Sequence, residues 1–238
     1  MDADYRLADN LDWERLAAAF AARGRVEVAD LLAPGQAAAL AAHLRARTDW
    51  HLVLNAGDKV YELSRAGFAD LSDVQRCELE RRVVAAGRTG FQYRYEAIRV
   101  PDAAAERGDD PLSRFVAFLS AAPIREALGK LMQIDDIAFA DGQATRYDHG
   151  HFLTSHDDAV AGKNRRAAYV FSLTPAWRPE WGGLLMFHGA DGNIEEAFAP
   201  QIGALRLFRV PQLHSVSYVT PFAAEPRLSV TGWLRAAD

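Results

Sequence analysis

The sequence predicts an α+β protein that is mainly β, a double-stranded β-helix (jelly roll) braced by amino-terminal helices. Alanine-rich stretches with helical spacing dominate residues 1–134, and short β-rich runs separated by Gly, Pro, Asp and Asn fill residues 135–238. We find no repeat, low-complexity tract or linker between the two parts. We therefore expect one domain over residues 1–238, with helix-rich support and flanking strands in 1–134 and the jelly-roll core in 135–238.

The first half is expected to form helices with short strands between them. Apolar residues recur at helical spacing over residues 11–22, 34–47, 71–86 and 111–132, and the last stretch is broken at Pro123. Pro34 suits the first turn of its helix. Runs of β-forming residues at 25–28, 50–54, 59–63 and 91–100 are expected to pair with the sheet or to flank it.

The second half is expected to form short antiparallel strands. They are predicted at about residues 137–147, 167–173, 183–187, 204–209, 214–219 and 228–234. Closely spaced short strands are typical of a jelly roll, in which two antiparallel sheets face each other across a pocket. The helices of the first half would then brace one sheet from outside.

Charge and cysteine content narrow the class of protein. The net charge is −5, and no basic footprint for a nucleic acid is present. Cys77 is the single cysteine, and the first ten residues lack the basic start and apolar run of a secretory signal. No apolar stretch approaches the roughly 20 residues needed to cross a bilayer. We expect a soluble cytoplasmic protein with no direct nucleic-acid or membrane partner, and its oligomeric state is not readable from the sequence.

Two histidines and an aspartate are the candidate metal ligands. In an extended segment, side chains at i and i+2 project to the same side, so His156 and Asp158 can reach one metal while Asp157 points away. His214 lies at the start of a later β-like run, and antiparallel strand reversals can return it to the first pair. Two imidazoles and one carboxylate on one face of an octahedron suit a mononuclear iron that keeps open positions.

Three further residues are candidates for binding an anion. Arg227 stands in an otherwise apolar β-run, where its guanidinium is costly to desolvate unless an anion meets it. Ser229 follows at i+2 and shares its face. Tyr147 ends an alternating run nine residues before His156, from where its phenol could donate to the same anion.

These motifs resemble the prolyl 4-hydroxylase branch of the Fe(II)/2-oxoglutarate dioxygenases. The matching segments, in chain order, are YDHGHFLTSHDD at 147–158, WGG at 181–183, GALRLF at 203–208, LHSV at 213–216 and RLSVTGW at 227–233. The resemblance covers roughly the last 100 residues. Within the branch, the HDD form and the long amino-terminal part are similar to bacterial relatives of oxygenases that hydroxylate a proline of a small-subunit ribosomal protein.

The resemblance implies a role for each candidate residue. His156, Asp158 and His214 would bind Fe(II), and Arg227, helped by Tyr147 and Ser229, would bind the distal carboxylate of 2-oxoglutarate. The family commonly has glycine just before its arginine, where this chain has the dipeptide Glu-Pro at 225–226. This departure puts the shape of that turn in question, though not the charge.

The implied activity is hydroxylation of an unactivated C–H bond, with a prolyl residue of a protein or peptide as the first candidate and succinate and CO2 as coproducts. Loops near 54–59, 86–95 and 159–166 would frame the pocket. One alternative is a cupin-like metalloenzyme that uses His149, His151 and His156 without 2-oxoglutarate. Another is a non-catalytic jelly-roll binding module.

Overall fold

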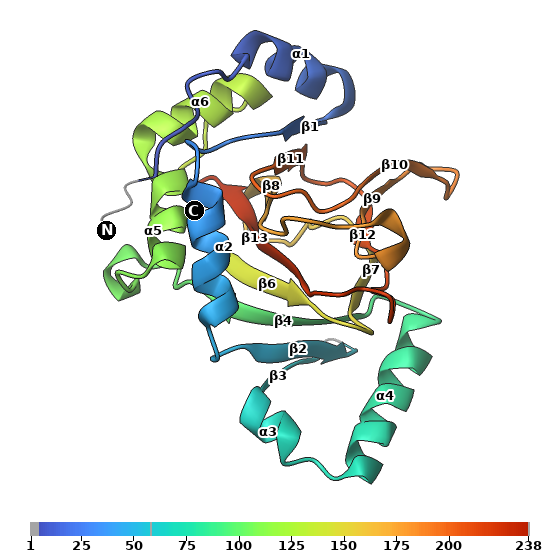
Figure 1. Ribbon diagram of the computed structural model, residues 1–238. Helices are drawn as coiled ribbons and strands as arrows, with labels where there is room; N and C mark the ends of the chain where they lie inside the picture. Colours follow the sequence, from blue (N-terminus) through green and yellow to red (C-terminus); the bar gives the residue numbers. More distant parts are fainter. Residues whose placement is uncertain (1–4, 58, 238) are drawn as a thin grey trace.

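The strands form one continuous, strongly curled sheet that folds over on itself (Figure 1). The computed structural model describes residues 5–57 and 59–237. Within them, hydrogen-bonded neighbours follow the order β1-β11-β8-β13-β6-β4-β7-β12-β9-β10, and all paired strands are antiparallel. The predicted jelly-roll architecture is confirmed.

The strands of the second half are β5 (Phe139–Ala140), β6 (Gln143–Tyr147), β7 (Phe152–His156), β8 (Arg165–Ser172), β9 (Leu185–His188), β10 (Ile194–Phe198), β11 (Leu205–Arg209), β12 (His214–Val216) and β13 (Arg227–Arg235). Those of the first half are β1 (Arg25–Val28), β2 (His51–Ala56), β3 (Lys59–Ser64) and β4 (Tyr93–Arg99). Strands from both halves therefore share one sheet, since β1 pairs with β11 and β4 pairs with β6 and β7.

Helices cover one side of the roll (Figure 1). They are α1 (Trp13–Arg23), α2 (Gln36–Ala46), α5 (Pro111–Ser120) and α6 (Ala122–Met132), whereas α3 (Arg65–Ala69) and α4 (Asp73–Gly87) lie beside β2–β4. Two 3-10 turns, η1 (Ala104–Glu106) and η2 (Pro179–Trp181), interrupt loops. The main core packs α1, α2, α5 and α6 against the sheet, with Leu40, Phe115 and Phe171 fully buried.

Local sequence explains where the helices begin and end. Asp12 accepts a hydrogen bond from the amide of Arg15 and caps α1, which ends at Gly24 in the left-handed conformation. Ser72 forms a capping box with Gln75 at the start of α4. The expected helices therefore match α1, α2, α4 and the α5–α6 pair within about two residues.

One helix, two strands and the two 3-10 turns were not predicted, and two predicted strands differ in extent. The strand expected over 214–219 ends at Val216. The strand expected over 137–147 is divided into β5 and β6 at Asp141 and Gly142, where the Asp141 carbonyl oxygen accepts from the Tyr169 hydroxyl at 2.8 Å. A Cβ at Gly142 would lie 2.5 Å from the Tyr169 hydroxyl oxygen. The unpredicted helix and strands are α3, β7 and β10, whose residues lack a clear period-2 or helical pattern. No helix in the described ranges is long and apolar enough to cross a membrane.

Candidate active site

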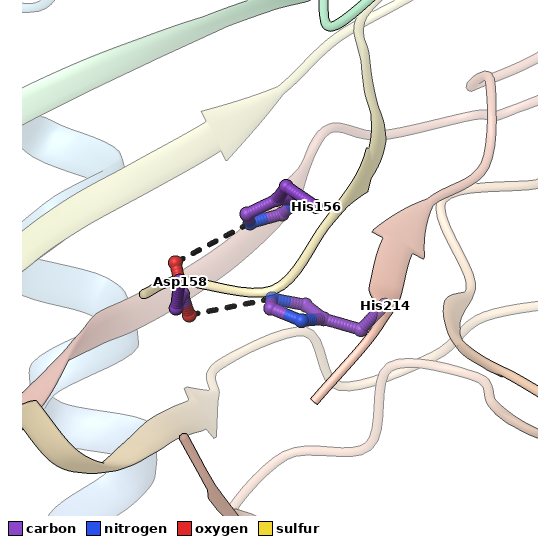
Figure 2. Close-up of side chains that lie close together, drawn as sticks. All are labelled: His156, Asp158 and His214. Carbon is purple, nitrogen blue, oxygen red and sulfur yellow. Dashed lines mark ion pairs between the residues drawn. The ribbon is translucent and has the colours of Figure 1, made fainter. Parts of the chain in front are cut away.

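His156, Asp158 and His214 converge at one point of the roll (Figure 2). His156 ends β7 and His214 begins β12, and the two residues are directly opposite in the antiparallel register. The Nε2 of His156 lies 3.4 Å from Oδ1 of Asp158, and the Nε2 of His214 lies 3.5 Å from Oδ2. One possible ligand atom from each residue lies within 4.8 Å of the others, so the group could hold a metal ion. We call it the metal triad.

Backbone carbonyls orient both imidazoles. The Nδ1 of His156 lies 3.0 Å from the Thr154 carbonyl oxygen, and the Nδ1 of His214 lies 2.8 Å from that of Gln212. A carbonyl oxygen can only accept, so each Nδ1 carries the proton and donates it. The Nε2 lone pairs then face Asp158 and are free for a metal, which is the arrangement usual for histidine ligands.

Asp158 reaches the triad for a different reason from the one predicted. The strand β7 ends at His156, and Asp158 has a φ of +63°, so the segment is not extended there and the i+2 rule does not apply. Arg165 donates to the Asp158 carbonyl oxygen at 3.0 Å and holds this turn. Burial opposes ionisation of Asp158, whereas the adjacent His156 and His214 lower the pKa of its carboxyl below the usual value.

A second constellation, which we call the anion pocket, lies in the same cavity of about 490 Å³. It comprises Arg227, Tyr147 and Thr145, which line the cavity, and Ser229, which does not line it but bonds both Arg227 and Thr145. Arg227 on β13 is opposite Tyr147 on β6, and Ser229 is opposite Thr145. The Arg227 guanidinium lies 5.0 Å from the centre of the Tyr147 ring and donates to the Ser229 hydroxyl at 3.3 Å.

The Arg227 side chain is buried, and no carboxylate in the described part of the chain balances its charge. Only 3% of the residue is exposed, and its Nε has no hydrogen-bond partner among the described residues. Burial lowers the pKa of Arg227 to about 10, with the Tyr147 phenol opposing the shift and Arg206 adding to it. A buried, incompletely bonded cation that opens on a cavity fits a small carboxylate ligand. The residues present therefore fit the distal carboxylate of 2-oxoglutarate as well as a mononuclear metal.

An aromatic column forms one wall of the cavity. Neighbouring ring centres of Phe91, Tyr93, Tyr95 and Tyr147 are 5.4–5.6 Å apart, and Phe91 also lies 5.3 Å from the His156 ring. From the sequence, the alternating Phe91, Tyr93 and Tyr95 allow two interpretations, a cradle for a proline ring or ordinary sheet core. Because β4 pairs with both β6 and β7, its aromatics join the metal triad to the anion pocket.

Parts of the loops expected at the pocket line its mouth. Phe91, Ala159 and Val160 contribute from the expected segments 86–95 and 159–166, and Arg165 lies further in, over the Trp233 ring. From the expected segment 54–59, Asp58 lies outside the described residues. The sequence analysis gave Thr145 no role in the site. Its position two residues before Tyr147, on the same face of the strand, was the available signal.

The alternative histidine cluster does not form in the described structure. The imidazole of His149 bonds the Ala223 carbonyl oxygen at 2.7 Å, and Nδ1 of His151 accepts from the Asp148 amide at 3.1 Å. Neither joins the metal triad. Burial, reinforced by Arg94, lowers the pKa of His151 to about 4. The cupin-like alternative is therefore not favoured.

Comparisons with known proteins match the same region. The model of the 2OG-Fe(II) oxygenase superfamily matches residues 142–235, a range that includes the metal triad and the anion pocket. Mouse prolyl 3-hydroxylase OGFOD1 is 30% identical over 116 residues, which are 46% of this chain and 21% of that protein. The chain thus spans about a fifth of the length of this curated relative.

Solved structures share the fold at low sequence identity. A Pseudomonas putida prolyl-4-hydroxylase has a TM-score of 0.61 and 20% identity, and the match covers 95% of this chain and all of that one. A Trichoplax adhaerens prolyl hydroxylase, solved with a hypoxia inducible factor peptide fragment, has a TM-score of 0.58 and 13% identity over 94% of this chain and 89% of that one. The family match supports the resemblance to the 2OG-Fe(II) oxygenases, and the shared fold confirms the predicted jelly roll.

Proposed function

We propose that the protein is an Fe(II)- and 2-oxoglutarate-dependent dioxygenase, because its site-bearing residues 142–235 match the model of the 2OG-Fe(II) oxygenase superfamily. Its reaction would hydroxylate an unactivated C–H bond and release succinate and CO2. The observation that carries the proposal is the presence, in one cavity, of a His-Asp-His triad and a buried arginine for which the described residues provide no countercharge.

Each constellation would hold one partner of the reaction. His156, Asp158 and His214 would bind the iron, and Arg227, with Tyr147 and Ser229, would bind the distal carboxylate of 2-oxoglutarate. Bound together, iron and 2-oxoglutarate supply the oxidising power for C–H hydroxylation, whereas the chain supplies orientation and exclusion of water. The aromatic column and the apolar residues Val60 and Val160 at the mouth would shield the reacting group.

We propose a prolyl residue of a protein or peptide as the target. The mouse relative is named as a prolyl 3-hydroxylase, and the Trichoplax enzyme was solved with a peptide. The motif resemblance to oxygenases that act on a small-subunit ribosomal protein points to that class of substrate. One domain over residues 1–238 and a cytoplasmic location without a direct nucleic-acid partner remain predictions.

An anaerobic titration tests the cofactors directly. The protein is loaded with Fe(II) and titrated with 2-oxoglutarate, and we expect the visible metal-to-ligand absorption band of a chelated keto acid. Arg227→Met should weaken this titration, and His214→Ala should abolish it. Wild-type protein that gives no band would contradict the proposed cofactors.

A second assay tests catalysis and target. The loaded enzyme is incubated in air with proline-containing peptides from small-subunit ribosomal proteins. We expect succinate and a peptide about 16 Da heavier at proline, because one oxygen atom is inserted. If succinate forms but no peptide stimulates its formation, the proposed iron and keto-acid site stands and the prolyl target is refuted. Chelation of the keto acid without succinate under any condition would favour the non-catalytic binding module.

A further inference from the structure

Gly183 lies against the side chain of Arg227. A Cβ at Gly183 would stand 3.2 Å from Cδ of Arg227, 3.2 Å from a methyl of Val219 and 3.3 Å from Cζ2 of Trp177. The residue has a φ of +61° and follows η2 in the turn that leads to β9. The anion pocket is thus closed behind the arginine by a position where even one methyl group would be crowded.

Two of the three neighbours of Gly183 are firmly held. The indole N–H of Trp177 donates to the Gly182 carbonyl oxygen at 2.8 Å, so its ring is fixed to the same turn. Val219 is fully buried, and its amide donates to the His151 carbonyl oxygen at 3.0 Å. Arg227 is held less tightly, with one long hydrogen bond to Ser229 and an Nε without a partner among the described residues. A methyl group at 183 would therefore displace the arginine before it displaced the others.

From this packing we infer that Gly183 and Trp177 are specificity-determining residues: they set the depth of Arg227 and so select the chain length of the dicarboxylic keto acid. The inference rests on the proposed function, because it concerns the ligand that spans the metal triad and the anion pocket. A keto acid that chelates the metal at one end and meets a guanidinium at the other must match the separation of the two. Gly183 lies against the arginine and Trp177 lies against Gly183, so both would act through the arginine.

The test compares keto acids of four, five and six carbons. Calorimetry on the Mn(II)-loaded protein gives the dissociation constants of oxaloacetate, 2-oxoglutarate and 2-oxoadipate, so the readout is binding and not turnover. We expect the wild type to prefer 2-oxoglutarate. Gly183→Ala should weaken the binding of 2-oxoglutarate about tenfold, because a small misplacement of a binding group is costly. The variant should also prefer 2-oxoglutarate less strongly over one of the other two acids.

Further variants distinguish a change in the position of Arg227 from a general disturbance of the fold. Trp177→Phe removes the Cζ2 contact, so in the double variant Gly183→Ala/Trp177→Phe much of the 2-oxoglutarate affinity should return. By itself Trp177→Phe should relax selectivity toward the six-carbon acid. Gly192→Ala is the matched control, because Gly192 has a φ of +81° and a Cβ at that position would have nothing within 4 Å. It should leave all three dissociation constants unchanged.

Failure of the inference and failure of the proposed function give different results. Wild-type protein that binds none of the keto acids overturns the proposed function. Wild-type protein that binds 2-oxoglutarate without preferring it overturns only the inference, as does a folded Gly183→Ala variant with unchanged preference. If Gly183→Ala does not fold, Trp177→Phe decides: relaxed selectivity supports the inference, and unchanged selectivity overturns it.

Discussion

The metal triad and the anion pocket are both built on cross-strand pairs, but they differ in how charge is balanced. His156 and His214 are opposite each other on β7 and β12, and Asp158 lies within 3.5 Å of both imidazoles. Tyr147 and Arg227 are opposite each other on β6 and β13, and no carboxylate of the described chain meets the guanidinium. The triad therefore has internal partners, whereas the pocket carries a charge that only a ligand can neutralise. Removal of a triad residue is therefore expected to weaken metal binding, whereas removal of Arg227 should weaken ligand binding and stabilise the ligand-free protein.

The largest expected effect is on metal binding by the triad. Asp158→Ala should weaken Fe(II) or Mn(II) binding by more than about 100-fold, because loss of an outer partner alone typically costs roughly 10- to 100-fold. Asp157→Ala is the neighbouring control and should retain metal binding, since the Asp157 carboxylate accepts from the Ala159 amide and is not part of the triad. Calorimetric metal titration measures both, and the reverse result would refute the ligand assignment.

The next effect separates affinity from stability in the anion pocket. Arg227→Met should weaken 2-oxoglutarate binding by about 2–5 kcal/mol and leave metal affinity within about twofold. It should also raise the free energy of unfolding of the ligand-free protein by roughly 1–3 kcal/mol, because it removes a buried charge that no carboxylate of the described residues balances. Urea denaturation with and without 2-oxoglutarate measures the free energies of unfolding and of ligand binding. Calorimetric metal titration measures the metal affinity.

Arg206→Met is the matched control for that stability effect. Arg206 is also buried, but it forms an ion pair with Glu27 at 2.7 Å and bonds the Ala199 carbonyl oxygen. Its removal leaves Glu27 without its partner and should lower the free energy of unfolding. If both variants were destabilised equally, the contrast between paired and unpaired buried arginines would be wrong.

A buried histidine outside both regions should affect stability and not ligand binding. The pKa of His151 is about 4 in the folded protein and about 6.5 when unfolded, mainly because burial disfavours its charged form. The unfolded chain therefore binds more protons between these values, and stability falls as pH drops from about 6.5 toward 4. Between about pH 7 and 4.5 the contribution of His151 is about 2–3 kcal/mol.

His151→Asn isolates this contribution. The amide oxygen of Asn can accept the hydrogen bond that Nδ1 of His151 accepts from the Asp148 amide, and Asn does not titrate. Urea denaturation at about pH 7 and 4.5 should show a smaller acid loss in the variant by that amount. Equal losses would mean that His151 is not the group protonated, and altered metal affinity would revive the alternative histidine cluster.

The smallest effect is expected at the turn before Arg227. Arg45 of α2 bonds Glu225 at 2.9 Å, and both side chains are about one-third exposed. Arg45→Ala should lower stability by less than about 1 kcal/mol and change 2-oxoglutarate affinity less than about twofold, since exposed ion pairs contribute little. A large loss of affinity would show that the Arg45–Glu225 ion pair is needed to position Arg227.

The sequence predicted which side chains converge better than it predicted the backbone geometry that places them. Asp158 was chosen by assuming an extended segment, yet it reaches the triad from a left-handed turn, which alternation of side chains cannot reveal. The burial of Arg227 followed from its apolar strand, because a lone charge in such a run needs a ligand. The contact of Gly183 with Arg227 joins segments that are distant in the chain through tertiary packing, and the sequence indicated only a turn there.

The pairing of β7 with β12 has a consequence for assembly of the molecule. His156 is opposite His214, but Val216 is opposite Leu153, so β7 accommodates one extra residue between the two contacts. Sliding β12 by a single residue would turn His214 to the opposite face, and the two imidazoles would no longer meet. An ion bound by both strands would thus stabilise only one alignment, so iron would act as a template for folding before any oxygen is consumed.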